Sequence, residues 1–285
     1  MSARQRPLTP ATDRITPEGA GALPPLAAQV QINVPFGLLW ERYLPLFLEQ
    51  RLNPEIGLDG PSLDRFSRQE FSQVAAKLHQ AGLSITLHAP FQDLLPGALD
   101  RHILGATRAR LHEAFALVEI FQPRSIVCHL GFEARHYTGV EDRWLENSLA
   151  TWEPLAAHAA RFACLVTLEN VYETETTLIR RLFSRWQESN IRLCLDVGHL
   201  QAFGGGDFTT WLTEVGDLVG QLHLHDNHGR HDDHLALGQG TIPLPEVLAY
   251  FASRGEPPLV TLEPHQENSV TPSLHYLATI WPWQG

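Results

Sequence analysis

The stretch Leu165-Val-Thr-Leu-Glu169 is a short apolar run that ends in a carboxylate, and the arrangement recurs along the chain. Other apolar runs end in a histidine or a carboxylate, at His88, His129, Asp196 and Glu263. Such side chains are depleted from strand interiors and are costly to bury without a partner. Their repetition at the ends of predicted strands therefore indicates that several strand ends converge on one metal site.

Further candidate ligands follow the same pattern. A seventh run carries His223 and His225, which are two residues apart and are therefore expected to point to the same side of a strand. His199 follows the run that ends at Asp196, and a loop after the run with His223 and His225 adds Asp232 and His234. Only one of His223 and His225 needs to be a direct ligand, and the sequence leaves that choice open. Mixed imidazole and carboxylate ligands suit zinc, manganese, iron or cobalt.

The rest of the chain predicts the scaffold. Eight segments read as strands, at 29–34, 54–59, 84–89, 125–130, 165–170, 192–197, 221–226 and 259–264. Segments between them carry apolar residues at helical spacing, such as Phe71, Val74 and Leu78. Eightfold alternation of strand and helix predicts the α/β class and a single closed (β/α)₈ TIM barrel. The active site of such barrels lies at the carboxyl ends of the strands, where every candidate ligand falls.

Length and composition indicate one barrel and no membrane span. The chain has 285 residues, close to the roughly 250 that are usual for one barrel. Residues 1–28 are rich in proline and glycine without apolar periodicity, so we expect a flexible N-terminal extension before a barrel at 29–285. There is no apolar run of about 18 residues. Cys128, Cys164 and Cys194 are expected to be buried free thiols, which predicts a reducing, cytoplasmic location.

The charge argues against a nucleic-acid partner. The net charge is −11 with neutral histidine, and Lys77 is the only lysine. Proteins that bind nucleic acid neutralise its phosphates with clusters of lysine and arginine. We therefore expect a small-molecule substrate. The oligomeric state stays open.

With these residues the chain resembles the xylose-isomerase-like TIM barrels, which include sugar isomerases, sugar epimerases and the endonuclease IV type of apurinic endonuclease. The resemblance covers about residues 29–282. It rests on Leu-His88-Ala-Pro, Cys-His129-Leu-Gly, Leu-Glu169-Asn, Leu-Asp196-Val-Gly-His199, Leu-His223-Leu-His-Asp226, Asp232-Asp-His234, Leu-Gly238-Gln-Gly240 and Leu-Glu263-Pro.

The resemblance implies one of two metal sites. Isomerases and epimerases of the family use one metal, whose ligands would be Glu169, Asp196, Glu263 and either His223 or His225. The endonuclease IV branch uses three zinc ions held by nine residues. By motif, these would be His88, His129 and Glu169 for the first ion, Glu169, Asp196, His223 and Glu263 for the second, and His199, Asp232 and His234 for the third. The cofactor implied is zinc or manganese, up to three ions.

The full set of nine ligand types favours a metal-dependent hydrolase that cleaves a phosphodiester in a small molecule. Short motifs at Asn33-Val-Pro-Phe36 and Asn53-Pro-Glu-Ile-Gly57 also resemble barrels that cut the nucleotide loop of cobamides. In this hypothesis Glu169 bridges two metals and Glu263 orients the attacking oxygen, which makes both catalytic.

Four further residues are expected to contact substrate or to support the ligands: His225, Asp226, Asn170 and Arg230. The alternative enzyme is a single-metal sugar or sugar-phosphate isomerase or epimerase, in which Glu169 and Glu263 also move a proton. An apurinic endonuclease and a non-catalytic metal-dependent binding barrel are disfavoured.

Overall fold

The computed structural model describes residues 23–186, 190–255 and 257–283. Eight parallel strands close into a barrel in the order β1 to β8, with β1 pairing to both β2 and β8. Their bounds are β1 Gln31–Pro35, β2 Asn53–Gly57, β3 Thr86–His88, β4 Ser125–His129, β5 Leu165–Glu169, β6 Ile191–Asp196, β7 Val219–Leu224 and β8 Leu259–Leu262. The predicted (β/α)₈ barrel is confirmed.

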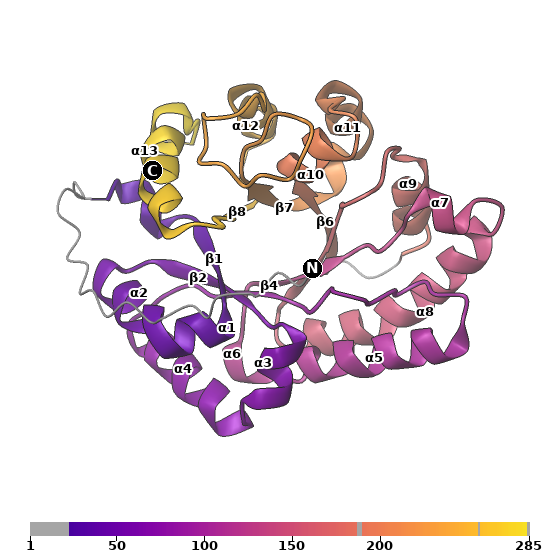
Figure 1. Cartoon of the computed structure of the whole chain (residues 1–285), viewed down its shortest axis with the longest axis horizontal. Coiled ribbons are helices and arrows are strands. Elements are labelled where there is room, and N and C mark those ends of the chain that lie inside the picture. Colours follow the sequence, from indigo (N-terminus) through magenta and orange to yellow (C-terminus); the bar gives the residue numbers. More distant parts are fainter. Residues whose placement is uncertain (1–22, 187–189, 256, 284–285) are drawn as a thin grey trace, which may run out of the picture.

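Helices surround the strands (Figure 1). They are α1 Phe36–Leu38, α2 Leu44–Gln50, α3 Gly60–Arg65, α4 Arg68–Gln80, α5 Arg101–Phe115, α6 Val118–Phe121, α7 Ala134–Tyr137, α8 Glu141–Ala160, α9 Thr177–Ser184, α10 Val197–Ala202, α11 Phe208–Val215, α12 Leu244–Ala252 and α13 Val270–Ile280. Four further segments are 3₁₀- or π-helical: η1 Pro25–Ala28, η2 Leu39–Tyr43, η3 Gly216–Leu218 and η4 Glu267–Ser269.

Helix α4 shows how the sequence forms the outer layer. Ser67 caps its first turn in a capping box with Glu70, which satisfies two backbone donors that the helix leaves free. The apolar stripe of Phe71, Val74 and Leu78 is buried against the barrel. The residues at helical spacing are therefore the ones that pack against the barrel, as the pattern predicts.

The amino-terminal boundary differs slightly from the expected one. Residues 1–22 of the predicted extension lie outside the described residues. Pro25–Ala28 form the turn η1, and Leu26 and Ala27 are each 5% exposed and pack into the hydrophobic core. Packing thus begins a few residues before residue 29. Among the described helices, none combines the length and the apolar character that crossing a bilayer requires.

Candidate metal centre

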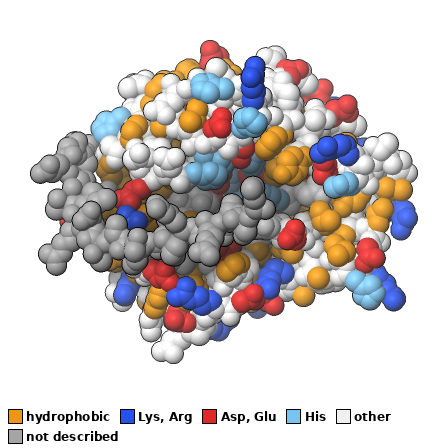
Figure 2. Space-filling view, viewed as in Figure 1, with side chains coloured by type: hydrophobic (Ala, Val, Ile, Leu, Met, Phe, Trp, Pro, Cys, Tyr) orange, Lys and Arg blue, Asp and Glu red, His pale blue; other side chains and the backbone are white. Residues whose placement is uncertain are grey.

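The strand register brings the candidate ligands level at the carboxyl end of the barrel. His129 pairs with Glu169 between β4 and β5, and Asp196 pairs with His223 between β6 and β7. Glu263 follows the last residue of β8. Adjacent strands of one barrel thus deliver these side chains to one place. Figure 2 shows histidine side chains, in pale blue, gathered in a hollow of the face in view.

Glu169 lies at the centre of the group, with an imidazole pair on each oxygen. Its Oε2 is 3.1 Å from His88 Nε2 and 3.5 Å from His129 Nε2. Its Oε1 is 3.2 Å from His199 Nδ1 and 3.4 Å from His223 Nδ1. Burial alone would raise the pKa of Glu169, but the charge of His223 and a hydrogen bond from His199 hold it well below its usual range. The carboxylate is therefore ionised and surrounded by nitrogen ligands.

One set of four side chains has the composition of a divalent metal site. Single ligand atoms of Glu169, Asp196, His223 and Glu263 all lie within 4.8 Å of one another. His223 Nδ1 is 3.0 Å from Glu263 Oε1 and 3.8 Å from Asp196 Oδ2. Neither ring nitrogen of the fully buried His223 has a hydrogen bond of good geometry. Nitrogens that lie among carboxylates without forming hydrogen bonds fit a cation, so these residues could hold a divalent metal.

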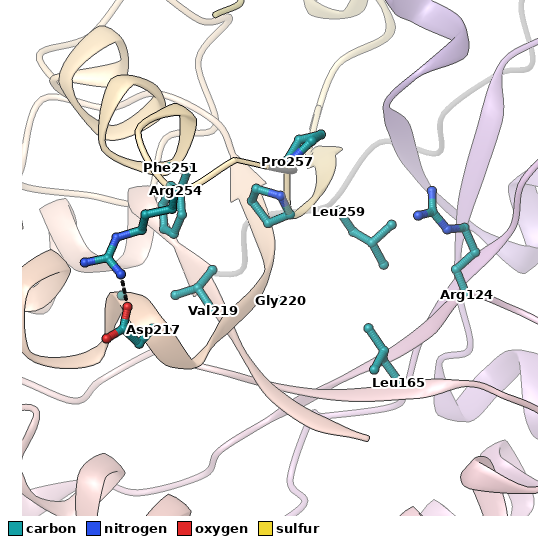
Figure 3. Close-up of a pocket in the computed structure, with 11 residues that line it drawn as sticks. Arg124, Leu165, Asp217, Val219, Gly220, Phe251, Arg254, Pro257 and Leu259 are labelled. Atoms are coloured by element: carbon teal, nitrogen blue, oxygen red, sulfur yellow. Dashed lines mark hydrogen bonds and ion pairs between the residues drawn. The ribbon is translucent and has the colours of Figure 1, made fainter. Parts of the chain in front are cut away.

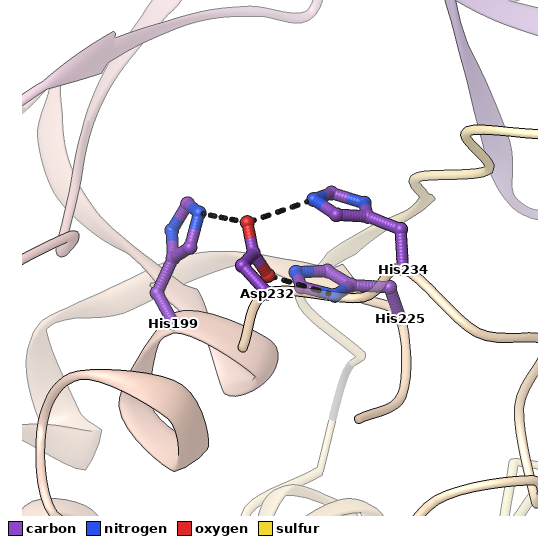
Figure 4. Close-up of side chains that lie close together, drawn as sticks. All are labelled: His199, His225, Asp232 and His234. Carbon is purple, nitrogen blue, oxygen red and sulfur yellow. Dashed lines mark hydrogen bonds and ion pairs between the residues drawn. The ribbon is translucent and has the colours of Figure 1, made fainter. Parts of the chain in front are cut away.

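Figure 4 shows a second set, which consists of His199, His225, Asp232 and His234. Ligand atoms of His199, His225, Asp232 and His234 also lie within 4.8 Å of one another. Asp232 Oδ2 is 3.0 Å from His234 Nε2 and 3.4 Å from His199 Nε2, and Asp232 Oδ1 is 3.5 Å from His225 Nδ1. The two sets meet at Asp196, whose Oδ1 is 3.1 Å from His225 Nε2.

His225 takes a different place from the one expected. Strand β7 ends at Leu224, so His225 lies just beyond it and joins the second set, while His223 belongs to the first. The two histidines thus belong to different sets, and which of them binds a metal stays a prediction.

His88 and His129 differ in whether they belong to one of these sets. His88 shares a set with Glu169 and His223, whereas His129 belongs to none of the three sets found among the described residues. Burial lowers the pKa of His129 to about 3, so its ring is neutral. The structure therefore brings eight of the nine predicted metal ligands into sets that could hold a metal, and their actual ligation stays a prediction.

The helix after β6 explains why Asp196 and His199 are three residues apart. Asp196 is the N-cap of α10, and its Oδ1 accepts a hydrogen bond of 2.6 Å from the His199 backbone N–H. A carboxylate at this position satisfies a free donor at the helix start and also faces the site. Asn170 holds the same turn, because its side chain bonds both the N–H and the carbonyl of Asp196, at 2.9 and 3.1 Å.

Asp226 and Arg230, which were also expected near the substrate or the ligands, lie in the loop after β7. Asp226 turns toward the following loop and accepts hydrogen bonds from the backbone of Gly238, Gly240 and Ile242, at 3.0, 2.8 and 3.2 Å. It therefore fixes the loop that returns from the second set. Arg230 is exposed, and within the described residues it has no ion pair.

Sequence reasoning missed four residues around the site. Glu55 is fully buried inside the barrel, with Oε1 3.1 Å from His223 Nε2. His265 stacks on His234 with ring centroids 3.5 Å apart, and Phe91 stacks on His129 at 4.2 Å. Glu173 is buried, which raises its pKa to about 7. A glutamate within the run Asn53-Pro-Glu-Ile-Gly57 was the one available signal, because a strand interior seldom carries an unpaired carboxylate.

A separate cavity of about 500 Å³ lies at the opposite end of the barrel (Figure 3). It is lined by residues that precede or begin strands, including Arg124, Leu165, Val219 and Leu259. Arg254 at its edge is paired with Asp217. None of the candidate ligands lines this cavity, so it is unconnected with the metal centre.

Known proteins resemble this chain over most of its length. The sequence profile of a family described as xylose isomerase-like TIM barrel matches residues 53–280. The uncharacterized protein MJ1311 of Methanocaldococcus jannaschii is 24% identical over 188 residues, which are 64% of this chain and 64% of that protein. The match thus covers slightly less than two thirds of this relative.

Two solved structures share the fold. A D-tagatose 3-epimerase-like protein superposes with a TM-score of 0.74 and 19% identity, over 88% of this chain and 96% of its own. The TTHB071 protein of Thermus thermophilus, soaked with zinc chloride, has a TM-score of 0.73 and 21% identity, over 88% of this chain and 97% of its own. At these identities the likeness establishes the architecture alone.

Proposed function

Since the chain belongs to the xylose isomerase-like TIM barrel family, we propose that it is a metal-dependent isomerase or epimerase of a sugar or sugar phosphate. The observation that carries this proposal is the convergence of Glu169, Asp196, His223 and Glu263 within 4.8 Å. The similarity to a D-tagatose 3-epimerase-like protein supports it, and gives it preference over the phosphodiesterase that the ligand count alone favours.

In this proposal Glu169 and Glu263 transfer the proton. A divalent metal at this site, when bound, polarises a substrate carbonyl and makes the neighbouring C–H more acidic. Glu263 has the more accessible side chain, 11% exposed against 1% for Glu169, so in this proposal Glu263 takes the proton from the carbon beside the carbonyl. Glu169 is proposed to return a proton to the opposite face, or to hold the proton that moves between carbons.

The substrate would meet histidine donors around these carboxylates. His88 and His129 lie on one side of Glu169, and His199 lies on the other. Imidazole N–H groups donate hydrogen bonds, which suits the hydroxyl groups of a sugar. The half-exposed ring of Phe91 beside His129 adds an apolar surface for its C–H face.

The second candidate function is hydrolysis of a small-molecule phosphodiester, such as the nucleotide loop of a cobamide. The observation that favours it is the second ligand set, which a single-metal isomerase does not need. Glu169, with two imidazoles on each oxygen, also has the form of a carboxylate that bridges two metals. In this case Glu169 would hold two ions, and Glu263 would orient the attacking oxygen.

One experiment separates the two functions. Protein loaded with manganese or zinc is incubated in D₂O with ketoses, aldoses and their phosphates, and NMR follows deuterium entering the carbon beside the carbonyl. Bis(p-nitrophenyl) phosphate is assayed in parallel, and elemental analysis gives metal per chain. Deuterium uptake lost in Glu263→Gln, but kept in the surface control His275→Ala, supports the proposal. Phosphodiester cleavage without deuterium uptake, together with more than one metal per chain, would favour the hydrolase instead.

A further inference from the structure

A layer of polar side chains fills the barrel below the metal centre. Barrel interiors are usually filled by valine, isoleucine and leucine. Here six polar residues from six strands are fully buried: Glu55, Thr86, Ser125, Thr167, Gln221 and Thr261. Burying so many polar groups is costly unless each is hydrogen-bonded, so their partners indicate what the layer is for.

Gln221 lies at the centre of the layer and has a fixed orientation. Its Oε1 accepts hydrogen bonds from the hydroxyls of Ser125 and Thr167, at 2.6 and 3.2 Å. Its Nε2 donates to Glu55 Oε2 at 2.6 Å and to Thr261 Oγ1 at 3.1 Å. The amide nitrogen thus faces Glu55.

Glu55 receives only donors. Besides Gln221, the hydroxyls of Thr86 and Thr261 each donate to its Oε2 at 3.0 Å. Its Oε1 accepts from Asn33 Nδ2 at 3.2 Å and lies 3.1 Å from His223 Nε2. Three donors hold Oε2 and thereby fix the orientation of the carboxylate. In this orientation Oε1 lies toward the His223 ring.

Carboxylate oxygens lie close to Nδ1 of the His223 ring. Its Nδ1 is 3.0 Å from Glu263 Oε1 and 3.4 Å from Glu169 Oε1. A hydrogen on Nε2 would lie toward Glu55 Oε1, 3.1 Å from that nitrogen, and would leave the Nδ1 lone pair for a cation among these carboxylates. A hydrogen on Nδ1 would instead leave the Nε2 lone pair directed at the Glu55 carboxylate.

We propose that Glu55 is a positioning residue, which fixes His223 in the form protonated at Nε2 so that Nδ1 binds the metal. The inference rests on the metal site of the proposed function. Carboxylates that accept a hydrogen bond from a metal-bound histidine hold the ring in place, and their loss typically weakens metal binding by about 10- to 100-fold. The polar layer holds Glu55 in turn, which accounts for its burial.

The first test reads the ring of His223 directly. Long-range ¹H–¹⁵N NMR of the zinc-loaded full chain, labelled with ¹⁵N-histidine, should show one histidine protonated at Nε2 and coordinated through Nδ1 that disappears in His223→Asn. Coordination through Nε2 would overturn the inference. This result needs no Glu55 variant, so it stands even if such a variant fails to fold.

The second test measures zinc affinity by competition with a chromophoric chelator. Glu55→Gln should bind zinc about 10- to 100-fold more weakly, because an amide NH₂ facing His223 favours the wrong protonated nitrogen. Thr86→Val is the matched control: it removes one donor to the other oxygen of Glu55 and keeps the contact with His223, so its zinc affinity should change much less.

The outcomes distinguish the inference from the function beneath it. Wild-type protein that binds no zinc overturns both the metal site and the role of Glu55. Wild-type protein that binds zinc, with Glu55→Gln binding equally well, overturns only the role of Glu55. Equal weakening in Glu55→Gln and Thr86→Val would show that the layer acts through stability alone, which also contradicts the inference.

Discussion

Replacing Gly198 with alanine tests whether His225 belongs to the second ligand set. A Cβ at residue 198 would lie 1.9 Å from His225 Cε1, 2.3 Å from Nε2 and 2.4 Å from Nδ1. Carbon atoms in contact normally stay about 3.5 Å apart, so the ring must move by more than about 1 Å. That shift removes His225 from its 3.1 Å contact with Asp196.

The expected cost follows from this displacement. Forcing an extra methyl group into a packed site costs typically about 1–3 kcal/mol. We therefore expect Gly198→Ala to lower the free energy of unfolding by this amount in urea at neutral pH, without a change in the denaturant slope. Elemental analysis should also show loss of a metal ion from preparations that hold more than one, because Asp232 and His234 lose a neighbouring ligand.

The chain supplies a control for the same substitution. Gly105 lies within α5 and is exposed, and a Cβ there would meet nothing within 4 Å. Gly105→Ala should therefore stabilise the protein by about 0.5–1 kcal/mol, since alanine loses less backbone freedom in a helix. If Gly198→Ala matched Gly105→Ala in stability and kept the wild-type metal content, the placement of His225 against Gly198 would be wrong.

Three other changes have defined outcomes. Glu263→Gln and Glu169→Gln should each lower kcat by about 10²- to 10⁴-fold with the variants still folded, measured on the sugar found active, and an unchanged rate in either would remove that residue from proton transfer. Burial alone would lower the pKa values of His199 and His223, but neighbouring groups, Asp196 first for His199, raise them well above 6.5. The pairing of these histidines thus stabilises the metal-free protein below about pH 6.5. Urea unfolding should show this stability being lost as the pH rises, unless zinc is added. Leu26→Ala should lower the free energy of unfolding by about 2 kcal/mol, because the side chain is 5% exposed in the core, whereas a neutral result would show that η1 contributes little.

The sequence predicted the barrel because its signal is repeated eight times. Each strand is a short apolar run, most carry a candidate ligand at or near the end, and parallel strands place such ends on one face. Strand limits were less accurate, as β7 shows: the sequence places it at 221–226, and the structure at Val219–Leu224. Gly220 discourages an earlier start, but it allows close approach of Arg192, whose Cβ would be 2.6 Å from a Cβ at residue 220. That contact is between strands, so a single segment carries no sign of it.

The helices show a similar limit. Leu111, Phe115 and Val118 recur at helical spacing, yet α5 ends at Phe115 and α6 begins at Val118. No glycine or proline marks this break. All three side chains are buried, so packing against the barrel decides where the helix is interrupted.

The candidate ligands could be named from the sequence, but the buried Glu55 beside His223 could not. His223 and Glu169 are visible in the sequence because each lies at the end of an apolar run, and the register then brings them within 3.4 Å. Glu55 lies inside its strand, and its meaning depends on Gln221 and Thr261, which are 166 and 206 residues away. Only closure of the barrel brings these strands together. Candidate metal ligands are thus apparent from local pattern, while a buried partner such as Glu55 becomes apparent only from the fold.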